Sequence, residues 1–350
     1  MMRCFPALIV CSVLSASAAA DSKDGKLDIY FIDVEGGAAT LLVTPSGESM
    51  LIDSGYPDNQ GRDRDRIIHV AKDVAGLSGI DHAAVSHWHR DHYGNHAALA
   101  AEFGVGTFWD RGIPDTLQED NSFETRIAAY RAASQNRSKA LQAGDRVPLT
   151  SGKTKLTVKV LTSGRKVVPN DGPKNPYASR HKQIDVDKSD NAASLSLLFQ
   201  FGDFRFLCCG DLTWNIEGKL VTPNNPIGTV DIFMVTHHGL PMSNNPALVL
   251  AVDPSVTIMC NGPTKGGAES TLKTLHEIKS LQDMYQLHRN IKLGASLQAP
   301  AEFIANPGTT ATCEGQWVKT SVAADGGSYT VQIGPAGRNR SYTTRKHPVP

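Results

Sequence analysis

One short stretch of the chain is unusually rich in histidine, and it constrains the fold more than any other feature. Five of the 12 histidines lie between residues 82 and 96, and the densest part reads Ser86-His87-Trp88-His89-Arg90-Asp91-His92-Tyr93-Gly94-Asn95. His87 and His89 alternate along an extended chain, so both imidazoles project to one side. Asp91 and His92 follow after a turn. Imidazole and carboxylate suit Zn²⁺, and burying so many ionisable groups is costly unless a cation neutralises them.

Strand patterns alternate with helical patterns along the rest of the chain. We expect strands, including two hairpins, at 27–34, 39–44, 49–52, 83–85, 156–161, 193–201, 204–209, 232–235, 255–259 and 317–333. We expect helices at 63–77, 96–103, 116–143, 246–252 and 271–281, and a helix end at 285–289. This alternation favours a layered α/β domain. The segment 164–190 has almost no periodicity, which is typical of a lid or a surface insertion.

Composition narrows the choice of function. Lysine plus arginine and aspartate plus glutamate both number 35, so the formal charge is zero and a globally basic nucleic-acid binder is not supported. Hydrophobic residues make up 40% of the chain, which is enough for a large core.

Residues 1–20 have the pattern of a secretory signal. Arg3 is the only charge, an apolar run extends from Phe5 to Leu14, and small residues precede Asp21. The run is too short to span a bilayer, and no later stretch is long and apolar enough to do so. We therefore expect a protein exported to the periplasm or the extracellular space, with no membrane span in the mature chain.

Four cysteines remain after this segment. Cys208 and Cys209 are neighbours on an expected strand and point to opposite faces, so they should not pair with each other. Because an exported protein permits disulfides, we expect a bridge between Cys260 and Cys313.

Two later motifs follow apolar strands. Cys209-Gly210-Asp211 ends one strand, and Thr236-His237-His238-Gly239 ends another. Side chains at the carboxyl ends of strands are where α/β folds build their sites.

Taken in this order, the motifs resemble those of the metallo-β-lactamase superfamily of hydrolases, over roughly residues 26–290. Leu51-Ile52-Asp53-Ser54-Gly55 is similar to the first motif, Ser86–Asn95 to the second, and Asp211 and the histidine pair to the later ones. The resemblance implies an α/β four-layer αββα sandwich over residues 21–345, with a lid at 164–190 and a strand extension at 300–345. The segments from Asn191 to Leu197, Cys209 to Asp211 and His237 to Gly239 most resemble the exported hydrolase domains of ComEC-type competence proteins.

The resemblance also implies a set of ligands for two Zn²⁺ ions. His87 and His89 would hold the first ion, Asp91 and His92 the second, and Asp211 would bridge them. His237 is the expected remaining ligand of the second ion, with His238 as its rival. Asp53 would orient a ligating histidine. Many members have a further histidine before the bridging aspartate, whereas this stretch offers Asp190, Asn191 and the more distant His181, so a site with one ion stays open.

The function implied is hydrolysis by a metal-bridged hydroxide, on a small molecule or on a phosphodiester, nucleic acid included. Asp91 would orient the nucleophile, and His238 would donate a proton to the leaving group if His237 is the ligand. The turn Asn261–Gly267 could bind an anion at the start of a helix. The alternatives are a lactone or β-lactam hydrolase and a metal-binding module without catalysis. No feature of the sequence indicates a protein partner.

Overall fold

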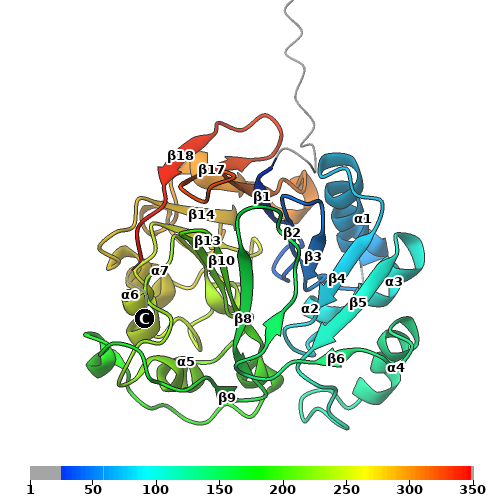
Figure 1. The fold of residues 1–350 in the computed structure, drawn as a ribbon, viewed down its shortest axis with the longest axis horizontal. Coiled ribbons are helices and arrows are strands. Elements are labelled where there is room, and N and C mark those ends of the chain that lie inside the picture. Colours follow the sequence, from blue (N-terminus) through cyan, green and yellow to red (C-terminus); the bar gives the residue numbers. More distant parts are fainter. Residues whose placement is uncertain (1–24, 58, 348–350) are drawn as a thin grey trace, which may run out of the picture.

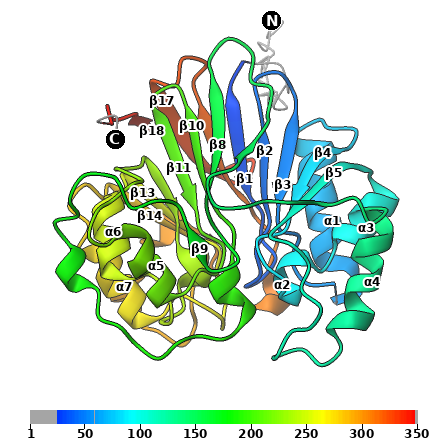
Figure 2. The same cartoon turned by 60° about the horizontal axis from the view of Figure 1, so that its bottom comes forward.

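The computed structural model describes residues 25–57 and 59–347. The signal-type segment 1–20 lies outside the described residues. Two large sheets pack face to face in the middle of the molecule, and helices cover the outer face of each sheet (Figures 1 and 2). This is the mixed α/β sandwich expected from the sequence.

The first sheet is built mainly from the N-terminal part of the chain and is closed at one edge by the C-terminal strands. Its order is β18 (Arg340–Thr343), β17 (Ser328–Ile333), β16 (Val318–Val322), β1 (Leu27–Phe31), β2 (Thr40–Val43), β3 (Ser49–Ile52), β4 (Ile80–Ala84), β5 (Val105–Asp110) and β6 (Lys139–Ala140).

The second sheet is built from the C-terminal part. Its order is β15 (Ile304–Asn306), β14 (Asp283–His288), β13 (Val256–Met259), β12 (Ile232–Met234), β11 (Phe204–Cys208), β10 (Ser196–Phe201), β8 (Leu156–Ser163) and β7 (Arg146–Val147), with β9 (Lys166–Val167) paired to β8. Strands β11 to β15 run parallel to one another, so the ends of β11 and β12 carry their following loops to the same edge.

Helices form the two outer layers (Figure 2). The first sheet is covered by α1 (Arg62–Ile68), α3 (His96–Glu102) and α4 (Phe123–Ala133), and the second by α5 (Trp214–Val221), α6 (Pro246–Val252) and α7 (Glu269–His276). The short α2 (Arg90–Tyr93) lies at the end of the sheets where the histidine cluster begins. Within the described residues, each helix is too short or too polar to cross a lipid bilayer.

Strand β1 shows why the sheets need a layer on each side. Leu27, Ile29 and Phe31 face the core between the two sheets, whereas Tyr30 faces the core beneath the helices. Because successive side chains of a strand point to opposite faces, a strand that is buried at every position, as β1 is, must be covered on both faces. The four-layer arrangement satisfies this requirement.

Several element boundaries differ from those expected. The segment 285–289 is not a helix end: strand β14 covers most of it, and all six β14 residues are buried. The helix expected over 116–143 is confined to α4, and the one expected over 63–77 continues from α1 as a π-helix, His69–Val74. The stretch 164–190 contains β9 and one short 3-10 turn, Ala178–Arg180, and a second 3-10 turn, Asp190–Ala193, begins at its last residue.

The expected disulfide is wrong. Cys208, Cys209, Cys260 and Cys313 are all free thiols. Cys313 instead lies 3.1 Å from an Asp33 carboxylate oxygen and 3.5 Å from the Arg66 guanidinium, while Cys260 is fully buried in the core between the sheets.

Candidate metal centre

The early cluster is positioned by the loop between β4 and α2. The chain leaves β4, bends at residues 86–88, and after the extended His89 enters α2, which carries Asp91 and His92. Both residues are buried. Ser86 fixes the start of this loop, because its backbone N–H and its hydroxyl donate to the two oxygens of Asp53, each at 2.7 Å.

Asp211 reaches the same place from the second sheet. It follows β11 after Gly210, whose φ is +55° and whose added Cβ would lie 2.9 Å from that of Ser86. Glycine therefore both adopts the left-handed conformation and allows the two loops to approach closely. This explains the Gly-Asp pair that the sequence places after the strand.

The adjacent His237 and His238 occupy a strained turn. Both have φ of +54°, a left-handed conformation that costs about 1–2 kcal/mol for each non-glycine residue. The turn is held by backbone hydrogen bonds from the His237 N–H to the Gly210 carbonyl at 3.0 Å and from the Gly267 N–H to the His238 carbonyl at 2.8 Å. Such strain is typical of a functional site and here brings both imidazoles to Asp211.

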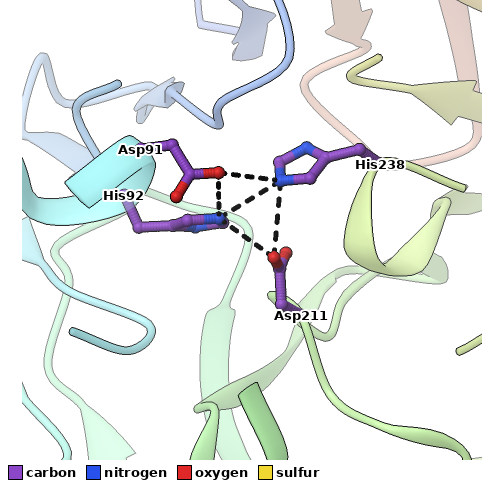
Figure 3. Close-up of side chains that lie close together, drawn as sticks. All are labelled: Asp91, His92, Asp211 and His238. Atoms are coloured by element: carbon purple, nitrogen blue, oxygen red, sulfur yellow. Dashed lines mark hydrogen bonds and ion pairs between the residues drawn. The ribbon is translucent and has the colours of Figure 1, made fainter. Parts of the chain in front are cut away.

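Four imidazoles converge on one oxygen of Asp211. Their Nε2 atoms lie at 3.2 Å for His92, 3.3 Å for His237, 3.4 Å for His238 and 3.9 Å for His87 from Oδ2. All five side chains are buried. Figure 3 shows how Asp91, His92, Asp211 and His238 point toward one another from different parts of the chain.

Each of these histidines uses its other ring nitrogen on a fixed partner. Nδ1 lies 2.8 Å from Asp53 Oδ2 in His92 and 2.9 Å from the Cys260 carbonyl in His238. In His237 it lies 3.1 Å from the Ser243 hydroxyl, and in His87 it lies 3.0 Å from the Ser86 hydroxyl. Anchoring one nitrogen leaves the other directed into the cluster, as in histidines that bind metals. Nε2 of His87 has no hydrogen-bond partner among the described residues.

The carboxylates of the cluster attract positive charge. Burial opposes ionisation of Asp91, but the neighbouring His92, His238 and Lys265 outweigh it and hold its pKa well below the usual range. For His92, burial opposes the charged form, yet Asp211, Asp91 and Asp53 raise its pKa well above normal. His237 behaves differently, because burial lowers its pKa to about 4 and keeps the ring neutral.

The donor set fits a bound cation. Asp91, His92, Asp211 and His238 offer ligand atoms within 4.8 Å of one another and form a possible metal-binding site. Neutral imidazole nitrogens and carboxylate oxygens are ligands of divalent transition metals, which would take the place of protons on the histidines.

The structure brings some of the predicted site residues together and places others outside the cluster. The four residues just named lie together, with His87 and His237 also directed at Asp211. His89 lies beside His87, with ring centroids 4.7 Å apart, but its Nε2 contacts Glu119 at 3.0 Å. His181 contacts Asn245 instead of the cluster.

Sequence reasoning assigned no role at this site to Lys265 and Tyr56. The Lys265 ammonium contacts the Asp91 carboxylate and lies 3.1 Å from the Tyr56 hydroxyl. Lys265 belongs to the turn 261–267, which was singled out for anion binding through its backbone; the side chain was overlooked.

A second buried group also escaped the sequence analysis. Asp33, His288 and Cys313 offer metal-type ligand atoms within 4.8 Å of one another. However, Arg66 lies 2.9 Å from the Asp33 carboxylate, so this group already contains a fixed positive charge.

The chain is similar to several solved structures and, over part of its length, to one sequence family. No curated protein sequence matches the chain. Among solved structures, a mutant of the CmlA β-hydroxylase is 15% identical over 75% of this chain and 52% of its own, with a TM-score of 0.42. This chain thus spans about half the length of that protein.

Two further solved structures are similar at the same level. Igni18, a metallo hydrolase from the archaeon Ignicoccus hospitalis, is 12% identical over 74% of this chain and 94% of its own, with a TM-score of 0.42. MEM-A1, a subclass B3 metallo-β-lactamase from a soil metagenome library, is 18% identical over 69% and 77%, with a TM-score of 0.37. No conclusion about activity follows from similarities this low.

A sequence model described as "Metallo-beta-lactamase superfamily" matches residues 32–134. The matched part contains Asp53 and the whole early cluster from His87 to His92. Asp211 and His238 lie outside it and meet this cluster in the folded chain. Over residues 32–134, the chain is therefore similar to the metallo-β-lactamase superfamily.

Proposed function

We propose that this protein is an exported, metal-dependent hydrolase that cleaves phosphodiesters with two Zn²⁺ ions. The observation that carries the proposal is the convergence of four buried Nε2 atoms on Asp211 Oδ2, within 3.2 to 3.9 Å. A bridging carboxylate with imidazoles on both sides is the arrangement a two-metal site requires. The composition of residues 1–20 supports export, and the motifs from Asn191 to Gly239 support a ComEC-like relationship.

The contacts favour His238 over His237 as the ligand of the second ion. His238 Nε2 lies 3.4 Å from Asp91 Oδ2 and 3.2 Å from His92 Nε2. We therefore assign Asp91, His92 and His238 to the second ion, with Asp211 as the bridge. This reverses the roles expected from the sequence for the two neighbouring histidines.

His87 and His237 are then the ligands of the first ion. Their Nε2 atoms lie 3.9 Å and 3.3 Å from Oδ2 of Asp211, the proposed bridge. His89 would complete the set by turning from Glu119.

When bound, the two ions would supply a nucleophile from water near neutral pH and stabilise charge on the substrate oxygens. The chain's own groups prepare the site for this. Asp53 fixes the ring of His92, and the Cys260 carbonyl fixes that of His238. Lys265 places an ammonium group beside Asp91, where it can attract an anionic substrate oxygen. This positive group favours a phosphodiester over a neutral lactone.

Metal content and turnover together test the proposal. We expect two zinc ions per chain by plasma emission, and hydrolysis of bis(4-nitrophenyl) phosphate but not of nitrocefin or an acyl lactone. His238→Ala should lose one metal equivalent and most turnover. His69→Gln, at an exposed histidine paired with Asp73, is the matched control and should lose neither. Turnover of only the lactam or the lactone would favour those activities, and metal binding without any turnover would favour a binding module.

A further inference from the structure

A cavity of about 450 Å³ lies next to the metal centre and is not explained by metal binding. Its walls come from residues 184–191, from the start of α5 at Thr213–Asn215, and from Met242. Asn191 belongs both to this cavity and to the metal centre, because its Nδ2 lies 3.4 Å from Nε2 of His237. A molecule at the metals could therefore extend into the cavity past a single side chain.

Most of the exposed large apolar side chains of the described residues line this cavity. Among the described residues four large apolar side chains are exposed, and three of them line this cavity: Ile184, Val186 and Met242. The fourth, Ile291, does not. Trp214 adds a further apolar wall. Apolar walls with a few polar groups are typical of a site for an organic ligand.

Two residues that line the cavity each have a buried polar atom without a hydrogen-bond partner within the described chain. Asn191 is only 7% exposed, and its Oδ1 has no hydrogen-bond partner among the described residues. The hydroxyl of Ser189 is buried and is likewise unpartnered within the described chain. Both residues line the cavity, so polar groups are interspersed among its apolar walls.

The cavity is preformed. The Trp214 indole N–H donates to the Lys182 carbonyl at 2.8 Å. Asn215 bonds to both backbone groups of Ile184, at 3.1 Å to its N–H and 2.8 Å to its carbonyl. These bonds attach the irregular segment to α5, so little ordering would be needed on binding.

The charges around the cavity limit what can enter it. Asp185 and Asp187 both line it, and their carboxylates would repel a phosphate group. A polynucleotide would have to place a neighbouring phosphate close to them. An uncharged group meets no such barrier.

We propose that this cavity binds the uncharged alkyl or aryl ester group of a small phosphodiester while the phosphate lies at the metal centre. The inference rests on the proposed function and deepens it, because it selects small apolar diesters over nucleic acid.

A homologous series of substrates tests it. Methyl, butyl and hexyl 4-nitrophenyl phosphates share one leaving group and differ only in the apolar ester. We expect KM to fall about tenfold from methyl to butyl, since each buried CH₂ contributes about 0.8 kcal/mol and burial here is partial. Val186→Ser and Ile184→Ser should abolish this trend, so that the butyl and hexyl esters have about the same KM as the methyl ester. Ile291→Ser is the matched control and should keep the trend.

The binding of phosphonates, which are not hydrolysed, tests the cavity assignment separately from the proposed function. Hexylphosphonate should bind at least tenfold more tightly than methylphosphonate. Competition with the butyl substrate measures this difference, and quenching of tryptophan fluorescence measures it if no diester is turned over. Val186→Ser should remove the difference. If no diester is hydrolysed but this preference holds, the proposed function fails and the cavity assignment stands. A flat KM series together with equal binding of the two phosphonates would overturn the assignment. Faster hydrolysis of single-stranded DNA, unaffected by Val186→Ser, would also overturn it.

Discussion

Two buried groups in this molecule use the same kinds of side chain but differ in how their charge is balanced. In the candidate metal centre, the ion pairs of the Asp211 carboxylate within the described part of the chain are all with imidazoles, at 3.2 to 3.9 Å. In the second group, Asp33 lies 2.7 Å from His288 and 2.9 Å from the guanidinium of Arg66. Both carboxylates are buried.

The surroundings of Arg66 strengthen this contrast. Arg66 also pairs with Glu35 at 3.2 Å, and Glu35 pairs with Arg62 at 3.1 Å. Fixed positive charge from α1 therefore neutralises the second group without an ion. Burial, followed by the nearby Asp33, raises the pKa of the Cys313 thiol to about 12, so the thiolate that a metal needs is disfavoured. The presence of ligand-type residues alone does not define a metal site. The two groups differ at the central carboxylate: Asp33 is paired with an arginine, whereas the lysine of the candidate metal centre, Lys265, pairs with Asp91 and not with Asp211.

The largest effect should follow from neutralising the shared carboxylate of the metal centre. Asp211→Asn keeps the shape of the side chain but removes the charge that faces four histidines. We expect turnover of bis(4-nitrophenyl) phosphate to fall at least about a thousandfold, because an electrostatic contribution of this kind is worth several kcal/mol. Circular dichroism should show a folded protein. Normal turnover in this variant would remove Asp211 from the mechanism.

Removing the counter-charge of the second group should harm stability instead. Arg66→Met leaves the buried Asp33 carboxylate without its guanidinium. We expect the free energy of unfolding in urea to fall by about 3 kcal/mol, as when one partner of a buried pair is lost. The number of bound metal ions should not change. A variant as stable as the wild type would show that Arg66 does not balance Asp33.

The sequence predicted the metal centre better than the second group, because local spacing carries more information than distant pairing. His87, Asp91 and His92 share one loop, and strand ends pointed to Asp211. The sequence favoured His237 over His238 as the ligand of the second ion, whereas we propose the reverse. Both residues adopt left-handed φ values, so alternation along a strand does not apply to them.

The second group joins Asp33 to His288, 255 positions apart along the chain. Strand β14, which ends at His288, is buried at every position and shows no alternation, so its pattern was mistaken for a helix end. The layered fold followed from the alternation of strands and helices, but the extent of α4 did not, since its surface is largely polar. The contact of His89 with Glu119 joins residues from two different loops, so the sequence around His89 could not predict it.

A third buried acid, Glu217, extends the comparison. It has neither an arginine nor the metal centre as a partner, and burial raises its pKa to about 7. The folded state therefore keeps the proton between pH 4.5 and 7, where the unfolded state releases it. The stabilising effect of this proton is fully present below pH 4.5 and is lost as the pH rises to 7.

We expect wild type to lose on the order of 2–3 kcal/mol of unfolding free energy over this interval relative to Glu217→Gln. Urea unfolding at several pH values measures the difference between the two proteins. Parallel pH profiles would mean that Glu217 is ionised in the folded state.

The smallest effect should come from Cys313→Ser, which tests whether the second group holds a metal. Serine is a poor metal ligand, so a metal bound by Asp33, His288 and Cys313 would be lost in this variant. We expect the zinc content to remain at two ions per chain, because Arg66 already neutralises Asp33 and another positive charge would be repelled. Plasma emission after gel filtration gives the count, with His238→Ala as the variant that must lose an ion. The zinc content of Cys313→Ser could instead fall by one equivalent while its turnover is unchanged. An arginine beside a buried carboxylate would then not prevent metal binding, and the distinction between the two groups would be wrong.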